Sequence, residues 1–152
     1  MTDQRDYILD TGVISALLDP GDLRHSYTRD IVEALDHPHK VTKYVSVVTI
    51  GELTFGVELA ECRKQKELDE IKGILKKAKG MLLRDISHNV AEVYGIIRGR
   101  TATKYMPKKI KSMKWPRSVA QWVDEITDKS LQINENDLWI VAQAVERDLM
   151  LV

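Results

Sequence analysis

Three carboxylates that lie far apart in the sequence occupy similar places in its pattern. Asp10, Glu52 and Asp137 each follow a short apolar run that predicts a β-strand, and each lies at or near the start of a run that predicts an α-helix. In an open parallel α/β sheet, ligands bind outside the carboxyl ends of the strands, so we expect the three side chains to converge. Clustered carboxylates repel one another unless a cation neutralises them. An all-oxygen site favours Mg²⁺ or Mn²⁺ and suits phosphodiester hydrolysis.

Each acid also has a structural interpretation as part of a helix start. Asp10 can cap the helix that begins near residue 11, because Asp is a preferred N-cap. Thr49 and Glu52 fit a capping box, with Thr49 as the cap. Asn134 can cap the last helix, which leaves Asp137 in its first turn, where the helix dipole favours negative charge. The two interpretations are compatible, since the start of a helix is a good place to fix a carboxylate.

The pattern of apolar residues predicts the elements that position these acids. Short apolar runs predict strands at residues 7–9, 44–48, 81–83 and 149–152, with a further short run at 131–133. Helical spacing predicts helices at residues 11–18, 22–35, 49–62, 64–79, 88–101 and 136–147. The predicted fold class is α/β, with a mostly parallel central sheet of four or five strands flanked by helices.

Composition limits the class of protein. A length of 152 residues suggests one domain with room for a core. The formal net charge is zero, so any attraction to nucleic acid must come from a local patch. One cysteine allows neither an intrachain disulfide nor a cysteine-based zinc site. We find no signal peptide and no membrane span, and we expect a cytoplasmic location.

The segment 104–117 differs in composition from the rest of the chain. It carries six basic residues and no acid, together with Trp115. A basic loop with an aromatic side chain is suited to contact RNA phosphates and bases, and Lys108, Lys109, Lys111 and Trp115 are the candidate contacts. The alternative is a solvated loop that balances acids elsewhere.

Three sequence motifs resemble those of a known family. Leu9–Ile14 holds Leu-Asp-Thr-Gly-Val-Ile, Val47–Val57 holds an Ile-Gly-Glu-Leu-x-x-Gly block, and Asn136–Ala144 holds Asn-Asp-Leu-Trp-Ile-Val-Ala-Gln-Ala. In this order, over nearly the whole chain, they are similar to the PIN domain and in particular to the VapC-type toxins of toxin–antitoxin pairs.

The resemblance implies a fold, an activity and partners. It implies a single three-layer PIN-like domain over residues 1–152, with a basic insertion at about 104–130. It further implies a metal-dependent endoribonuclease in which Asp10, Glu52 and Asp137 are both the catalytic residues and the ligands of Mg²⁺ or Mn²⁺. The implied partners are an RNA substrate, a cognate antitoxin protein and a second copy of the chain. No association with a membrane is implied.

One feature departs from the family pattern. The family usually has a fourth acidic or amide residue just after the last strand, and the sequence has none there. This leaves a second hypothesis, a non-catalytic or weakened PIN-like domain that binds RNA or protein.

Overall fold

The computed structural model describes residues 5–37 and 39–152. The chain divides into two compact units. The sheet unit holds the described residues up to Asp85 together with Arg147–Val152, and the helical unit is Ile86–Glu146. The predicted single domain over residues 1–152 stays a prediction.

A parallel sheet organises the sheet unit. Its four strands, in the order β3-β2-β1-β4, all run in one direction. Because parallel neighbours need long crossover connections, each strand reaches the next through helices. The strands are β1 (Tyr7–Leu9), β2 (Lys43–Ser46), β3 (Leu82–Arg84) and β4 (Met150–Leu151). This confirms the predicted α/β class with a parallel sheet flanked by helices.

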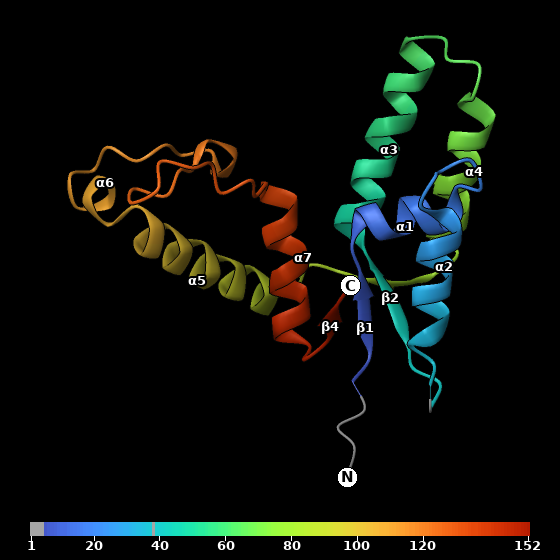
Figure 1. Ribbon diagram of the computed structural model, residues 1–152, viewed down its shortest axis with the longest axis horizontal. Helices are drawn as coiled ribbons and strands as arrows, with labels where there is room; N and C mark the ends of the chain where they lie inside the picture. The colour runs from blue at the N-terminus through green and yellow to red at the C-terminus, as the bar shows by residue number, and fades with distance from the viewer. Residues whose placement is uncertain (1–4, 38) are drawn as a thin grey trace. The chain divides into compact units, whose positions relative to one another are not determined.

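Four helices accompany the sheet in this unit. The bounds of α1 agree with the prediction for residues 11–18, and α2 begins three residues later than the predicted helix. Figure 1 shows α3 and α4 side by side. The helices are α1 (Thr11–Leu18), α2 (His25–Ala34), α3 (Val47–Cys62) and α4 (Leu68–Lys79).

The chain breaks between α3 and α4, where the sequence pattern predicts a helix over residues 64–79. Lys64 adopts a φ of 51°, in the left-handed region that ends helices. The N–H groups of Lys64 and Gln65 donate to the carbonyl oxygens of Glu61 and Ala60, both at 3.0 Å. These bonds satisfy the last carbonyls of α3, so the predicted start at residue 64 is wrong and α4 begins at Leu68.

The core of the sheet unit joins the strands to the helices. Leu9 and Val45, at the ends of two neighbouring strands, are fully buried with Ile14 of α1 and Ala78 of α4. Val32 of α2 completes this cluster. Burial of these side chains holds the start of α1 at the carboxyl end of β1. Each Leu, Ile or Val side chain contributes about 1.5–3 kcal/mol when fully buried.

The helical unit contains no strand among its described residues, although Leu131–Ile133 was expected to form one. Leu131 and Ile133 instead pack against the core around Trp122, and the N–H of Leu131 donates to the carbonyl oxygen of Trp122 at 2.9 Å. The elements are α5 (His88–Tyr105), α6 (Pro107–Lys111), the 3₁₀ turn η1 (Val119–Gln121) and α7 (Glu135–Glu146). Over the described residues, no helix is both long and apolar enough to cross a membrane.

Candidate active site

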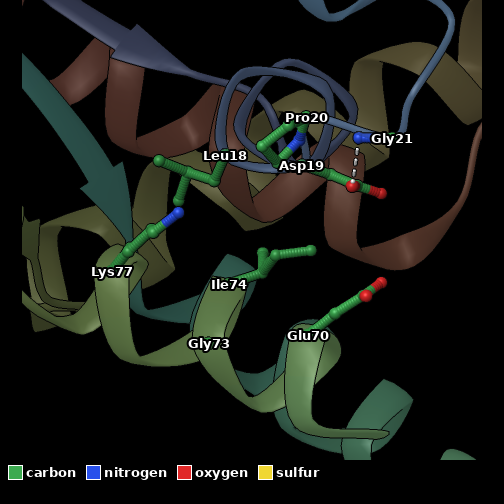
Figure 2. Close-up of a pocket in the computed structure, with 8 residues that line it drawn as sticks. All are labelled: Leu18, Asp19, Pro20, Gly21, Glu70, Gly73, Ile74 and Lys77. Carbon is green, nitrogen blue, oxygen red and sulfur yellow. Dashed lines mark hydrogen bonds between the residues drawn. The ribbon is translucent and has the colours of Figure 1, made fainter. Parts of the chain in front are cut away.

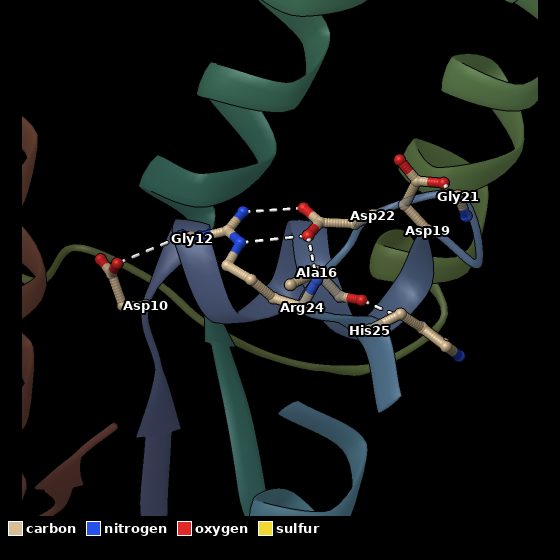
Figure 3. A network of polar contacts seen from close by, with 8 residues as sticks. All are labelled: Asp10, Gly12, Ala16, Asp19, Gly21, Asp22, Arg24 and His25. Atoms are coloured by element: carbon tan, nitrogen blue, oxygen red, sulfur yellow. Dashed lines mark hydrogen bonds and ion pairs between the residues drawn. The ribbon is translucent and has the colours of Figure 1, made fainter. Parts of the chain in front are cut away.

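Asp10 occupies the junction between β1 and α1. Its backbone is extended, and its Oδ2 accepts a hydrogen bond from the N–H of Gly12 at 3.1 Å (Figure 3). A Cβ at Gly12 would lie 3.3 Å from Asp10 Oδ2, so any other residue at this position would crowd the carboxylate. The structure confirms the N-cap interpretation, and it also places the acid at the carboxyl end of a parallel strand.

Glu52 does not belong to the predicted capping box. Ser46 caps α3, because its Oγ accepts a hydrogen bond from the N–H of Val48 at 3.0 Å. This cap starts α3 at Val47, two residues before Thr49, so Glu52 lies in the second turn. The capping-box interpretation of Thr49 and Glu52 is therefore wrong, and the carboxylate of Glu52 is held in another way.

A hydroxyl pair joins Glu52 to the residue after Asp10. The Oγ1 of Thr11 donates a hydrogen bond to Oε2 of Glu52 and lies 2.9 Å from Oγ1 of Thr49. A hydroxyl has one hydrogen, so the bond between the two threonines must be donated by Thr49. The result is a directed chain from Thr49 through Thr11 to Glu52 that links the starts of two helices across 41 positions of sequence.

The sequence interpretation assigned no role to Thr11 and gave Thr49 only the role of a helix cap. Two sequence signals point to them. Thr11 directly follows a candidate carboxylate, and Thr49 precedes Glu52 by three positions, which puts both on one helix face. Thr49 is fully buried, and a buried hydroxyl needs a partner.

An ion pair lies at the turn between α1 and α2. The guanidinium of Arg24 donates to both carboxylate oxygens of Asp22, from Nε at 3.0 Å and from Nη2 at 2.7 Å (Figure 3). The Arg24 hydrogen bonds lower the pKa of Asp22 to about 2. This bidentate geometry fixes the turn that follows α1.

Asp137 lies in the first turn of α7, in the helical unit. Its N–H donates to Oδ1 of Asn134 at 2.9 Å, and its Oδ2 accepts from the N–H of Asn134 at 3.0 Å. This reciprocal pair confirms Asn134 as the predicted cap. Glu135 forms an ion pair with Arg98 at 3.0 Å. The convergence of Asp137 with the two acids of the sheet unit stays a prediction.

The donor atoms determine which cation the candidate residues suit. Asp10, Glu52, Thr11 and Asp137 offer only oxygen, which fits Mg²⁺ or Mn²⁺ and not a soft metal. Within the described part of either unit, no three His, Cys, Asp or Glu side chains are grouped to hold a metal ion.

The basic segment is partly helical and not the predicted loop. Lys104 lies in the last turn of α5, and three lysines lie in α6. The backbone N–H groups of Lys108 and Lys109 donate to the carboxylate of Glu125 at 3.0 and 2.7 Å. Glu125 thus caps α6 through the backbone. Lys108 and Lys111 are exposed and Lys109 is half-buried, and their RNA contacts stay a prediction.

A pocket of about 480 Å³ in the sheet unit lies between the turn after α1 and helix α4. In Figure 2 the side chain of Ile74 points toward this turn, with Lys77 and Glu70 at opposite ends. None of the three predicted acids lines it. The Asp10–Glu52 junction therefore remains the candidate site in this unit.

Comparisons with known proteins agree with this parallel α/β fold. The PIN domain family model matches residues 7–152. The fold is similar to the crystal structure of VapBC2 from Rickettsia felis bound to a DNA fragment from their promoter, with a TM-score of 0.59 and 19% sequence identity. That match covers 95% of this chain and 84% of the other. A search of curated proteins finds no match. The chain belongs to the PIN-domain family.

Proposed function

We propose that the chain is a metal-dependent endoribonuclease and the toxin of a type II toxin–antitoxin pair. PIN domains are generally nucleases, and the family match covers almost the whole chain. The observation that carries the proposal is the hydrogen bond from Thr11 to Glu52. It ties a second carboxylate to the residue beside Asp10, at the sheet edge where parallel α/β proteins bind their ligands.

The proposed roles follow from how each side chain is held. Asp10, Glu52 and Asp137 are the metal ligands, and Mg²⁺ or Mn²⁺ when bound would activate water and stabilise charge on the phosphate. The Gly12 N–H orients Asp10, and Thr11 orients Glu52.

The partners follow from the fold. The structure of VapBC2 from Rickettsia felis holds that assembly on promoter DNA. By this likeness we propose a cognate antitoxin for this chain, and a complex of the two that binds DNA. We further propose a homodimer and a cytoplasmic location.

A cleavage assay tests the nuclease proposal. The purified protein is incubated with a mixed pool of end-labelled cellular RNA in Mg²⁺, in Mn²⁺ and in EDTA, and fragments are mapped on gels. We expect cleavage with either metal and none in EDTA, and Asp10→Asn should abolish it. Asp30→Asn is the matched control, because among the described residues this exposed side chain of α2 pairs only with Arg29, at 3.6 Å.

The same assay separates the second hypothesis, a non-catalytic PIN-like domain. Such a domain binds RNA without producing metal-dependent fragments. Cleavage by the purified chain that persists at full rate in Asp10→Asn would overturn the assigned site.

A further inference from the structure

A second pocket, of about 570 Å³, lies wholly within the helical unit. This volume is within the range of small-molecule sites, about 300–1,000 Å³. Two tryptophans, two arginines and a glycine-containing face of α5 surround it. The lining residues that matter here are Gly95, Arg98, Gly99, Trp115, Arg117 and Trp122.

The walls of this pocket combine a rigid aromatic side with an open helix face. Trp122 is 2% exposed, and its Nε1 donates to the carbonyl oxygen of Pro116 at 2.8 Å, which fixes the ring. On the opposite element, a Cβ at Gly95 or Gly99 would meet no atom within 4 Å. The space above these glycines is therefore available to a ligand.

The two arginines differ in the hydrogen bonds and ion pairs that their guanidinium groups make. The guanidinium of Arg98 bonds the hydroxyl of Tyr94 at 2.9 Å and the carbonyl oxygen of Arg117 at 2.7 Å, and it pairs with Glu135. Arg98 thus fixes the frame of the pocket. Arg117 is exposed, and over the described residues its guanidinium has no hydrogen bond or ion pair. Its five donors remain available to a ligand.

The charge around the pocket is positive. The segment 104–117, which supplies Ile110, Trp115 and Arg117 to the lining, carries six basic residues and no acid. Glu125 is occupied by two backbone N–H groups of α6, and Glu135 by Arg98. An anionic ligand is favoured here. The two indoles favour a ligand with a flat base over an acidic peptide.

We propose that this pocket holds one unstacked base of single-stranded RNA, with Trp115 as the stacking surface and Arg117 bonding the adjacent phosphate. Every base has a π-face, and stacking on aromatic side chains together with a basic surface is how proteins bind single-stranded nucleic acid. Trp115 is half-buried, lines the pocket and makes no hydrogen bond among the described residues, so part of its indole is open to a ligand. The inference rests on the proposed function in taking RNA as the ligand.

Binding is measured on the full chain carrying Asp10→Asn, so that the probe stays intact. The probe is a fluorescein-labelled 12-nucleotide single-stranded RNA, followed by anisotropy, and the same strand annealed to its complement is the competitor. Gly99→Leu fills the pocket from a position with open space and should raise helix propensity, so the fold should be kept. Gly73→Leu is the matched control, because Gly73 is also a helical glycine with open space and lines the other pocket.

We expect Gly99→Leu and Trp115→Ala each to weaken binding by about 5- to 150-fold, the range for loss of one stacked base. Trp115→Phe should recover most of the affinity, since it keeps an aromatic face. Gly73→Leu should bind as the parent does, and the duplex should compete poorly. Quenching of tryptophan fluorescence by the RNA should shrink in Trp115→Phe.

The outcomes separate this inference from the nuclease proposal. Unchanged RNA affinity in both Gly99→Leu and Trp115→Ala overturns it and leaves the pocket to a protein ligand. If the two pocket variants weaken RNA binding but the chain with Asp10 restored cuts no RNA, the inference is supported and the nuclease proposal is wrong. If the chain cuts RNA but neither variant changes binding, the nuclease proposal is supported and the inference is wrong.

Discussion

The two units hold their candidate acids by different means. In the sheet unit, Glu52 is held by Thr11 across 41 positions of sequence, from one helix start to another. In the helical unit, Asp137 is held by Asn134, three positions away, through a reciprocal pair of bonds to the backbone. One arrangement exists only when the sheet unit is folded, while the other is complete within a single helix start.

This difference predicts different consequences of mutation. A bond between distant elements couples the position of the acid to the packing of the unit. A local cap contributes to helix stability and leaves the acid on the same backbone when it is lost. We therefore expect mutations at the acids of the sheet unit to change the cleavage rate and the stability together.

The largest expected effect tests whether the acids of the two units act as one site. Asp10→Asn and Asp137→Asn should each lower the rate of RNA cleavage at least about 100-fold, because each removes a metal-binding charge. The double variant should lose little more than either single one, since groups that act as a unit are not additive. Independent, multiplying losses in single-turnover cleavage assays would break the assignment.

Thr11→Val tests the long-range bond. It removes the donor to Glu52 and the acceptor of Thr49, and it should destabilise the chain by about 1–3 kcal/mol. Cleavage should fall by about 10–100-fold, as for other residues that orient a metal ligand. Urea unfolding and cleavage rates measure the two losses.

Two controls accompany Thr11→Val. Thr11→Ser keeps the hydroxyl and should restore most of both quantities. Thr54→Val removes an exposed hydroxyl that donates to the carbonyl oxygen of Ile50, within its own helix, and should change stability by under about 0.5 kcal/mol.

Replacing Lys108, Lys109 and Lys111 together with Ala tests the basic helix. RNA affinity should fall roughly tenfold, and the slope of log affinity against log salt should flatten by about 2, at roughly 0.7 per phosphate contact for a single strand. The control removes Lys76, Lys77 and Lys79 from the last turn of α4 in the sheet unit. Equal changes in slope for both triple variants would show general attraction without a contact surface on α6.

Asn134→Ala tests the local cap. It should cost about 1 kcal/mol of stability through loss of the bond from the N–H of Asp137. Cleavage measured at a temperature where the chain is folded should change no more than a few-fold, because the backbone N–H that bonds Asp137 remains. A loss as large as that of Thr11→Val would remove the contrast between the two units.

The smallest effect concerns the turn after α1. Arg24 holds the pKa of Asp22 at about 2, below the ordinary 3.8. A depressed folded-state pKa stabilises the fold above the unfolded value, and this contribution is lost as pH falls from about 3.8 through about 2. NMR titration of the Asp22 carboxyl should show this midpoint, and Arg24→Gln should return it toward 3.8. An unchanged midpoint in the variant would exclude Arg24 as the cause.

The sequence by itself determined those features that depend on neighbours in the chain. The bounds of α1, the cap at Asp10 and the cap at Asn134 were all predicted, because a cap joins residues within one turn. The parallel sheet was also predicted, since short apolar runs separated by helices allow little else.

Only the tertiary structure decided the features that depend on distant partners. The bond of Thr11 to Glu52 arises because parallel pairing of β1 with β2 puts two helix starts side by side. Leu131 and Ile133 pack in the core around Trp122 instead of forming a strand, because the described residues of the helical unit contain no strand to pair with them. Likewise, the basic segment forms α6 because Glu125, 16 and 17 positions away, accepts its first N–H groups. The spacing of residues within one helix or strand does not identify such partners, because they lie many positions away in the sequence.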